Sequence, residues 1–322
     1  MYLLTKTTET ELNRVQATIT KQLSNEKIIQ EIYEYIFNVK GKKTRALLCL
    51  LASKSSDIKP KNRIALASII ELLHTATLVH DDVVDESERR RGTESVNQVW
   101  TNSYSVLMGD FIYSKAFILM VKLGISSILD ELAKATNDIA RGEIIQLELF
   151  ENKQPIMLDD LLKVSYLKTG RLFEASAKTG AMLACKSKEE IKIFGQLGKA
   201  LGTAFQIQDD ILDYEAFKLD IGKPAFKDFR EGKITFPLYF ALQNIDKKNR
   251  RFLLDRLGQS KLLKKDQNII YQLIRDDKTQ KEINALLDKY AKETLKHLNK
   301  LKHHPCYNEM LNLINFSHLR KI

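Results

Sequence analysis

No proline occurs between Pro60 and Pro155. Because proline is the residue that most strongly interrupts a helix, its absence from this stretch favours long helices. Over this stretch apolar residues recur three and four positions apart, which is the spacing of one helix face. We find no convincing set of alternating, β-branched segments bounded by turns. Because 44% of the residues are hydrophobic, the chain can bury a real core. The sequence therefore predicts an all-α fold of long helices.

The same periodicity extends along most of the chain. We expect helices over residues 10–38, 44–54, 62–86, 103–122, 126–149, 158–184, 187–215, 234–244, 247–257, 264–275 and 278–300. The one long loop punctuated by glycine and proline runs from Asp220 to Pro237, and loops of that length are often functional. No internal repeat or domain boundary stands out, so we expect a single domain over residues 1–322.

The net charge and the cysteines indicate which partners and which cellular compartment to expect. The net charge of +10 admits nucleic acid, an acidic membrane surface or an anionic substrate as the partner. Since the bases are mixed with acids and not interleaved with aromatic residues, we do not expect nucleic acid. The three cysteines lack metal-ligand spacing and cannot all pair, which fits a reducing compartment. The N-terminus is too polar for a signal peptide, and Glu71 and His74 interrupt the most apolar stretch. We therefore expect a cytoplasmic protein without a transmembrane segment.

An unusual mixture of charges ends the apolar stretch LLHTATLVHDDVVDESERRRG, residues 72–92. On a helix, Asp81 and Asp85 project from the same face. If their carboxylates lie ~5–6 Å apart, they repel each other by roughly 3 kcal/mol at an effective dielectric constant near 20. From this motif alone two readings stay open. Either Asp85 pairs with Arg89 on a solvated surface, or a bound cation lies between the two aspartates.

A second acidic cluster favours the bound cation. The segment FQIQDDILDY repeats the D-D-x-x-D spacing at Asp209, Asp210 and Asp213. Two such clusters facing each other would form a cage of oxygen ligands. Oxygen ligands without His or Cys favour Mg²⁺, which binds a few carboxylates and keeps positions for substrate phosphates.

Basic residues near these clusters could bind the phosphates. Lys42 and Arg45, in GKKTR, stand at the predicted start of a helix, where the dipole disfavours positive charge. They form either a solvated basic turn or an anion site. Arg90 and Arg91 follow Asp85, and we expect them one to two helical turns beyond it. His74 shares the helix face of Asp81, so we favour a place in this cluster over a purely structural role.

Taken together, these motifs resemble those of one enzyme family, the trans-polyprenyl diphosphate synthases. The matching segments are GKKTR, HTATLVHDD, GDFIYSKAF, GEIIQLE, KTGRLFEASA, LGTAFQIQDD and GK…KD…EGKITFP, in the family's order over nearly the whole chain. The resemblance is strongest to the bacterial long-chain branch. It implies the isoprenoid-synthase fold, in which antiparallel helices surround a large central cavity.

The resemblance also assigns site residues. It implies about three Mg²⁺ ions per active site, and the metal ligands are Asp81, Asp85 and Asp209, with Asp82, Asp210 and Asp213 as outer partners. It assigns the diphosphate of isopentenyl diphosphate to Lys42, Arg45, His74 and Arg91. It assigns the allylic diphosphate to Arg90, Lys168, Lys223 and Lys233. Lys168, Thr169 and Gln206 are the expected catalytic residues, the last two facing the reacting carbons.

The implied reaction elongates an allylic diphosphate, which we expect to be farnesyl diphosphate, by successive head-to-tail condensation with isopentenyl diphosphate. The expected product is a long all-trans polyprenyl diphosphate for quinone side chains, with octaprenyl preferred. A homodimer and transient membrane contact during product release are further expectations. The family often has Gly-Gly and Pro where this chain has Lys40-Gly41 and Ala46, and Arg89 is an additional base without an assigned role.

Product length is expected to depend on the residues one turn before Asp81. Ala76 and Thr77 occupy these positions, and in the family aromatic residues there stop growth at short products. Their small size predicts an open tunnel. Phe117, Met120 and Leu147 are candidates for the residue that closes it, plain core packing being the alternative for each.

Three other functions stay open. The first is a synthase of shorter (geranylgeranyl) or longer (solanesyl) product within the same family. The second is a class I terpene cyclase, whose second metal motif carries Asn, Ser or Thr, and Glu where this chain has D-D-x-x-D. The third is a non-catalytic subunit of a heteromeric synthase, but such subunits lose the aspartates that this chain retains.

Overall fold

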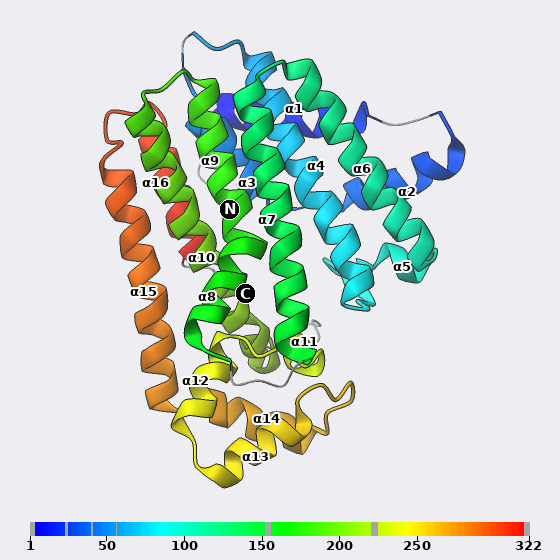
Figure 1. The fold of residues 1–322 in the computed structure, drawn as a ribbon, viewed down its shortest axis with the longest axis vertical. Helices are drawn as coiled ribbons and strands as arrows, with labels where there is room; N and C mark the ends of the chain where they lie inside the picture. The colour runs from blue at the N-terminus through cyan, green and yellow to red at the C-terminus, as the bar shows by residue number, and fades with distance from the viewer. Residues whose placement is uncertain are drawn as a thin grey trace. The chain divides into compact units, whose positions relative to one another are not determined.

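The computed structural model describes residues 4–22, 25–39, 41–55, 57–151, 156–219 and 225–318, and these are almost entirely helical (Figure 1). Among the described residues the only strands are β1 (Arg89–Arg90) and β2 (Thr93–Glu94). The all-α prediction is therefore confirmed. The chain forms two compact units, the first from residues 1–137, 172–198 and 297–313, and the second from residues 138–171, 199–296 and 314–322.

The first unit is built around one long helix. Its elements are α1 (Lys6–Thr20), α2 (Lys27–Asn38), α3 (Thr44–Ala52), α4 (Pro60–Val84), the β1–β2 hairpin, α5 (Val96–Val99), α6 (Asn102–Leu123), the start of α7 (Ser126–Glu151), most of α9 (Arg171–Leu183), the start of α10 (Lys188–Leu219) and most of α16 (Tyr307–His318). Helix α4 packs most extensively against α6, beside which it lies in Figure 1. Leu66, Ile69 and Leu73 of α4 and Ile112 of α6 are almost fully buried in their shared core.

Close backbone approach fixes two contacts in this core. A Cβ on Gly180 of α9 would lie 2.7 Å from the carbonyl oxygen of Cys49 in α3. A Cβ on Gly109 of α6 would clash with the imidazole ring of His80 in α4. Glycine at these positions therefore allows the helices to pack closely.

Helix α4 begins with Pro60, whose fixed φ suits the first turn of a helix. A buried ion pair between its Arg63 and Glu11 ties it to α1. Among the described helices, α4 alone is long and apolar enough to cross a bilayer, and 61% of its most apolar window is buried inside the protein. This burial is typical of a core helix, so the apolar stretch is weak evidence for membrane insertion.

The second unit has smaller apolar cores. Its elements are the end of α7, α8 (Leu158–Ser165), the π-helical turn η1 (Tyr166–Gly170), the end of α10, α11 (Lys227–Arg230), α12 (Phe236–Asn244), α13 (Lys247–Arg256), α14 (Lys264–Ile274) and most of α15 (Asp277–Asn299). Phe226 and Phe229 pack with Leu238 and Ile270 in one core. Ile207 of α10 and Phe236 of α12 belong to another.

Most predicted helices form within a few residues of their expected ends. The helix predicted over residues 10–38 is wrong as one element, because α1 ends at Thr20 and Glu26 is extended (φ −74°, ψ 122°) before α2 begins. The run predicted over residues 158–184 divides into α8, η1 and α9. Helices α5, α11 and α16 were not predicted, although Met310, Leu313 and Ile314 of α16 are fully buried at helical spacing.

Candidate active site

The first acidic cluster lies at the C-terminal end of α4. Asp81 and Asp82 belong to the last turn, and Asp85 caps it, its amide donating to the Asp81 carbonyl at 2.8 Å. Glu86 then adopts the left-handed conformation (φ 47°), and the Ser87 amide donates to the Asp82 carbonyl at 2.9 Å. These bonds form a Schellman motif, which ends the helix. Three carboxylates thus lie where the helix dipole disfavours negative charge, as expected of a cation-binding site.

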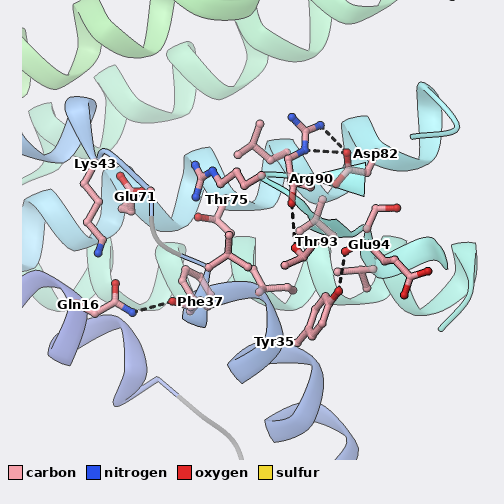
Figure 2. Close-up of a pocket in the computed structure, with 18 residues that line it drawn as sticks. Gln16, Tyr35, Phe37, Lys43, Glu71, Thr75, Asp82, Arg90, Thr93 and Glu94 are labelled. Carbon is pink, nitrogen blue, oxygen red and sulfur yellow. Dashed lines mark hydrogen bonds and ion pairs between the residues drawn. The ribbon is translucent and has the colours of Figure 1, made fainter. Parts of the chain in front are cut away.

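The arginines after this cluster lie on a hairpin, so the expectation that Arg90 and Arg91 lie one to two helical turns beyond Asp85 is wrong. Arg90 pairs with Thr93 across β1 and β2, and Arg91 and Gly92 form the turn with φ values of 51° and 88°. Positive φ at both turn residues is typical of a tight two-residue hairpin. The turn brings Arg90 back to α4, where its Nε donates to Oδ1 of the buried Asp82 at 2.9 Å (Figure 2).

Two predicted phosphate-binding residues contact each other directly. Nη1 of Arg45 lies 3.0 Å from Nε2 of His74. Burial, Arg45 and Arg91 lower the pKa of His74 well below its ordinary value, so the ring is neutral and Nε2 accepts this bond. The Arg45 guanidinium also lies over the Phe173 ring, 4.5 Å from its centroid. His74 therefore helps to orient Arg45, whereas the Lys42 side chain is exposed.

Arg91 lines a small cavity on a neighbouring face of α4. The cavity of about 60 Å³ is bordered by Glu71, Thr75 and Asp82 of α4 and by Lys43 (Figure 2). The other lining residues are Gln16, Tyr35, Ile36, Phe37, Val39, Gly41, Leu78, Val79, Arg90, Arg91, Thr93, Glu94, Ser95 and Val96. A cavity of this size holds a few water molecules.

In the second unit, two of the predicted catalytic residues, Thr169 and Gln206, form one hydrogen-bonded chain with Asp210. Thr169 Oγ1 donates to Gln206 Oε1 at 2.6 Å, and Gln206 Nε2 donates to Asp210 Oδ1 at 2.7 Å. Thr169 and Lys168 belong to the π-helical turn η1, a rare geometry that often occurs at functional sites. The Lys168 ammonium lies 2.7 Å from Oε2 of Glu143 on α7.

Two aspartates of the second acidic cluster bind backbone amides. Asp213 accepts hydrogen bonds from the amides of Lys227 (3.0 Å) and Asp228 (3.2 Å), and Asp210 accepts one from the amide of Phe236 (3.3 Å). Burial and the nearby Asp228 raise the pKa of Asp213 to about 8, although these amide bonds favour its ionised form. Asp210 and Asp213 thus anchor α11 and the start of α12 to α10.

Three predicted residues of the second unit remain to be described. Asp209 is half-buried on α10. The Lys233 ammonium lies 2.8 Å from Glu231 Oε2. Lys223 lies outside the described residues.

The predicted chain-length residues differ in their surroundings. Ala76 and Met120 are buried in the core of the first unit, and the hydroxyl of the half-buried Thr77 donates to the His74 carbonyl at 2.7 Å. Phe117 and Leu147 are 42% and 43% exposed. The assignment of these side chains to a tunnel stays a prediction.

A metal ion fits the acidic clusters by donor chemistry. Among the described residues, no three His, Cys, Asp or Glu side chains are close enough to form a metal site by themselves. Mg²⁺ commonly binds one or two protein carboxylates and takes its other ligands from water and substrate phosphates. The oxygen-only end of α4 matches that requirement.

Comparison with known proteins decides the family. The sequence pattern of the Polyprenyl synthetase family matches residues 26–274. The chain belongs to the polyprenyl synthetase family. It is 42% identical over 231 residues to the octaprenyl diphosphate synthase of Escherichia coli (strain K12), covering 71% of each chain. The resemblance read from the motifs is thus confirmed, and the protein is a prenyltransferase.

Solved structures show the same fold for this polyprenyl synthetase. A decaprenyl diphosphate synthase from Rhodobacter capsulatus has a TM-score of 0.90 at 32% identity, with 98% of each chain covered. A polyprenyl synthase from Caulobacter crescentus CB15, complexed with calcium and isoprenyl diphosphate, has a TM-score of 0.90 at 31% identity, covering 98% of this chain and 97% of its own. The predicted isoprenoid-synthase fold is confirmed.

Two residues at the sites of this polyprenyl synthetase were not predicted. Glu143 pairs with Lys168, and Glu71 faces the cavity beside Arg91. Glu71 could have been singled out from the sequence, because a lone acid in an apolar helix segment needs a compensating charge nearby. Glu143 lies in the matching segment GEIIQLE, but its pairing with Lys168, 25 residues away, could not be read from the sequence.

Proposed function

We propose that this prenyltransferase elongates an allylic diphosphate, preferably farnesyl diphosphate, by repeated condensation with isopentenyl diphosphate. The observation that carries the proposal is the acidic C-terminal end of α4, with cationic side chains beside it in the same unit. Arg45 and Arg91 are near enough to His74 to lower its pKa together, and Arg90 pairs with Asp82. Carboxylates for a metal and cations for phosphates thus occur together, as Mg²⁺-diphosphate binding requires.

The roles of the chain's own residues follow from their chemistry. Lys42, Arg45, His74 and Arg91 would bind isopentenyl diphosphate, and Arg90, Lys168, Lys223 and Lys233 the allylic diphosphate. Asp81, Asp85 and Asp209 would hold Mg²⁺, which when bound neutralises the charge that develops on the departing pyrophosphate. Arginine suits these contacts because its planar fork donates two parallel hydrogen bonds to a phosphate.

The condensation breaks the allylic C–O bond and forms a C–C bond between the allylic carbon and the double bond of isopentenyl diphosphate. A proton is then lost to the released pyrophosphate, so no dedicated protein base is required. Thr169 and Gln206 would stabilise the allylic cation through their dipoles. Their mutual bond at 2.6 Å fixes the orientation of both groups.

We propose a long-chain product, with octaprenyl diphosphate preferred, for quinone side chains. Ala76 and Thr77 support this because small side chains before the first acidic cluster leave room for a growing tail. Relatives named for octaprenyl and decaprenyl products support a long chain without fixing its length. The reaction would take place in the cytoplasm, with transient membrane contact as the apolar product leaves.

We also propose a homodimer. Leu107, Ile118 and Val121 of α6 are 65%, 45% and 69% exposed. Large apolar side chains along one helix of a folded domain are typical of a surface that another chain covers.

Asparagine substitutions of the proposed metal ligands test the function. Asp81→Asn and Asp209→Asn should each lower kcat by about 100-fold or more, because each removes charge from the metal site. The measurement is incorporation of labelled isopentenyl diphosphate at increasing Mg²⁺. Asp130→Asn is the matched control, since Asp130 pairs with Lys134 on an exposed surface. Full activity of the wild-type enzyme in excess chelator, or of Asp81→Asn, would contradict the proposal.

A further inference from the structure

We propose that Glu71 is a positioning residue, whose buried carboxylate holds Lys43 and Arg91 beside the isopentenyl diphosphate site. The inference rests on the proposed function, because Arg91 is assigned to that substrate. Glu71 itself would contact neither the substrate nor the metal. It would set the place of the cations before substrate binds.

The position of Glu71 demands a compensating charge. Its side chain is only 4% exposed, and its neighbours Ile70 and Leu72 are fully buried. Among the described residues, its Oε2 has no hydrogen-bond partner. An isolated buried carboxylate costs several kcal/mol. Such a group is stabilised only if positive charge lies nearby.

Lys43 and Arg91, which line the cavity between α4 and the hairpin, supply this positive charge. Glu71 lines the same cavity, and Figure 2 shows Lys43 and Glu71 at the same end. Burial raises the pKa of Glu71, while Arg91, Arg45 and Lys43 oppose this rise. Burial lowers the pKa of Arg91, and Glu71 opposes that change in turn. A cavity of about 60 Å³ leaves room for water to bridge the charged groups.

Both cationic residues have a left-handed backbone conformation. Lys43 and Arg91 have φ values of 46° and 51°, a left-handed conformation that is unfavourable for a residue with a side chain. Lys43 also caps the N-terminus of α3, where the helix dipole disfavours a cation. The hairpin turn accounts for the conformation of Arg91, and attraction to Glu71 offsets the unfavourable position of Lys43 at the helix N-terminus.

The two possible roles of Glu71 predict opposite changes in diphosphate affinity when its carboxylate is removed. If Glu71 only added negative charge near an anion site, its removal would tighten diphosphate binding. If it positions Lys43 and Arg91, its removal allows them to separate, because the remaining cations repel each other. The second outcome weakens binding of the diphosphate and leaves the reacting carbons untouched.

Glu71→Gln distinguishes these outcomes, since it keeps the shape and removes the charge. We expect the Kd for inorganic pyrophosphate, measured by calorimetry, and the KM for isopentenyl diphosphate to rise about tenfold, with kcat within about twofold of wild type. Glu71→Asp, which keeps the charge, should recover part of the affinity. Glu131→Gln is the matched control, because Glu131 is equally buried in the same unit but pairs with Lys178 at 2.6 Å. Its pyrophosphate affinity should not change.

Unchanged or tighter pyrophosphate binding by Glu71→Gln would overturn the inference. If that variant does not fold, Lys43→Met tests the same link from the cationic side and should also weaken pyrophosphate binding about tenfold. Unchanged binding by Lys43→Met would equally overturn it. A wild-type protein that binds pyrophosphate but forms no prenyl product would refute the proposed function alone, because the positioning role is measured by binding.

Discussion

Gly41→Ala should weaken substrate binding without weakening the fold. A Cβ at residue 41 would lie 2.5 Å from Nη1 of Arg91 and 2.9 Å from its Cζ. Ordinary contacts are about 3.4–4 Å, so the guanidinium must move by about 1 Å. Arg91 would then lose the charge-assisted hydrogen bonds that we propose it makes to the diphosphate, which are together worth about 1.5–3 kcal/mol. The expected rise in KM for isopentenyl diphosphate is therefore about 10-fold to 150-fold.

The fold should tolerate the same change. The clashing atoms belong to the end of a flexible side chain, and residue 41 does not have the positive φ that alanine avoids. Replacing glycine by alanine at such a position restricts the unfolded chain and adds about 0.4–1 kcal/mol to the free energy of unfolding.

Steady-state kinetics and urea unfolding of the same preparation test both parts. Gly195→Ala is the control, because the nearest atom to its new Cβ lies 3.7 Å away. That variant should be somewhat more stable, since alanine favours a helix interior, and its KM should not change. An unchanged KM for Gly41→Ala would refute the placement of Arg91 at the substrate. A loss of more than about 2 kcal/mol of stability would show that the contact supports the fold instead.

Three further outcomes are expected. Ala76→Phe should shorten the product, as measured by mass spectrometry. It should also lower the free energy of unfolding by about 1–3 kcal/mol, because residue 76 is fully buried. An unchanged product length would contradict a tunnel that runs past residue 76. Burial lowers the pKa of His304 to about 4, whereas a histidine in the unfolded chain has a pKa of about 6.5. The neutral His304 ring therefore contributes its full stabilisation above pH 6.5, and this stabilisation is lost as the pH falls toward 4. Urea unfolding should show that the free energy of unfolding falls by about 3 kcal/mol between pH 8 and pH 4, and that His304→Gln largely abolishes this fall. An equal fall in the variant would show that other groups cause it. Gly180→Ala should lower the thermal midpoint strongly, since its Cβ meets the Cys49 carbonyl oxygen at 2.7 Å, and an unchanged midpoint would show that α3 and α9 can separate at little cost.

The helices could be predicted because their signal is local. Apolar residues three and four apart place one face of α4 and one of α6 in the same core, and both helices begin and end within two residues of expectation. The hairpin was not predicted, because the helix was expected to end near Glu86 and no element was assigned to the three arginines that follow. Gly92, which follows them, is the residue that permits the turn (φ 88°).

The site was predictable as a set of residues but not as a set of contacts. Spacing identifies Asp209, Asp210 and Asp213 together, yet the amide partners of Asp213 come from Lys227 and Asp228. Such partners depend on tertiary structure, which spacing within one helix does not contain. Spacing likewise cannot show which of two adjacent lysines faces the cavity, because the left-handed conformation of Lys43 decides it.

We propose above all that this polyprenyl synthetase extends a prenyl chain with the help of Mg²⁺. The direct measurement incubates the purified protein with farnesyl and isopentenyl diphosphates, with Mg²⁺ or with chelator, and determines product length by mass spectrometry. We expect a series of products that ends at octaprenyl diphosphate and forms only with Mg²⁺. A series that ends at geranylgeranyl diphosphate would contradict the long-chain proposal, and no elongation with Mg²⁺ would contradict the central claim.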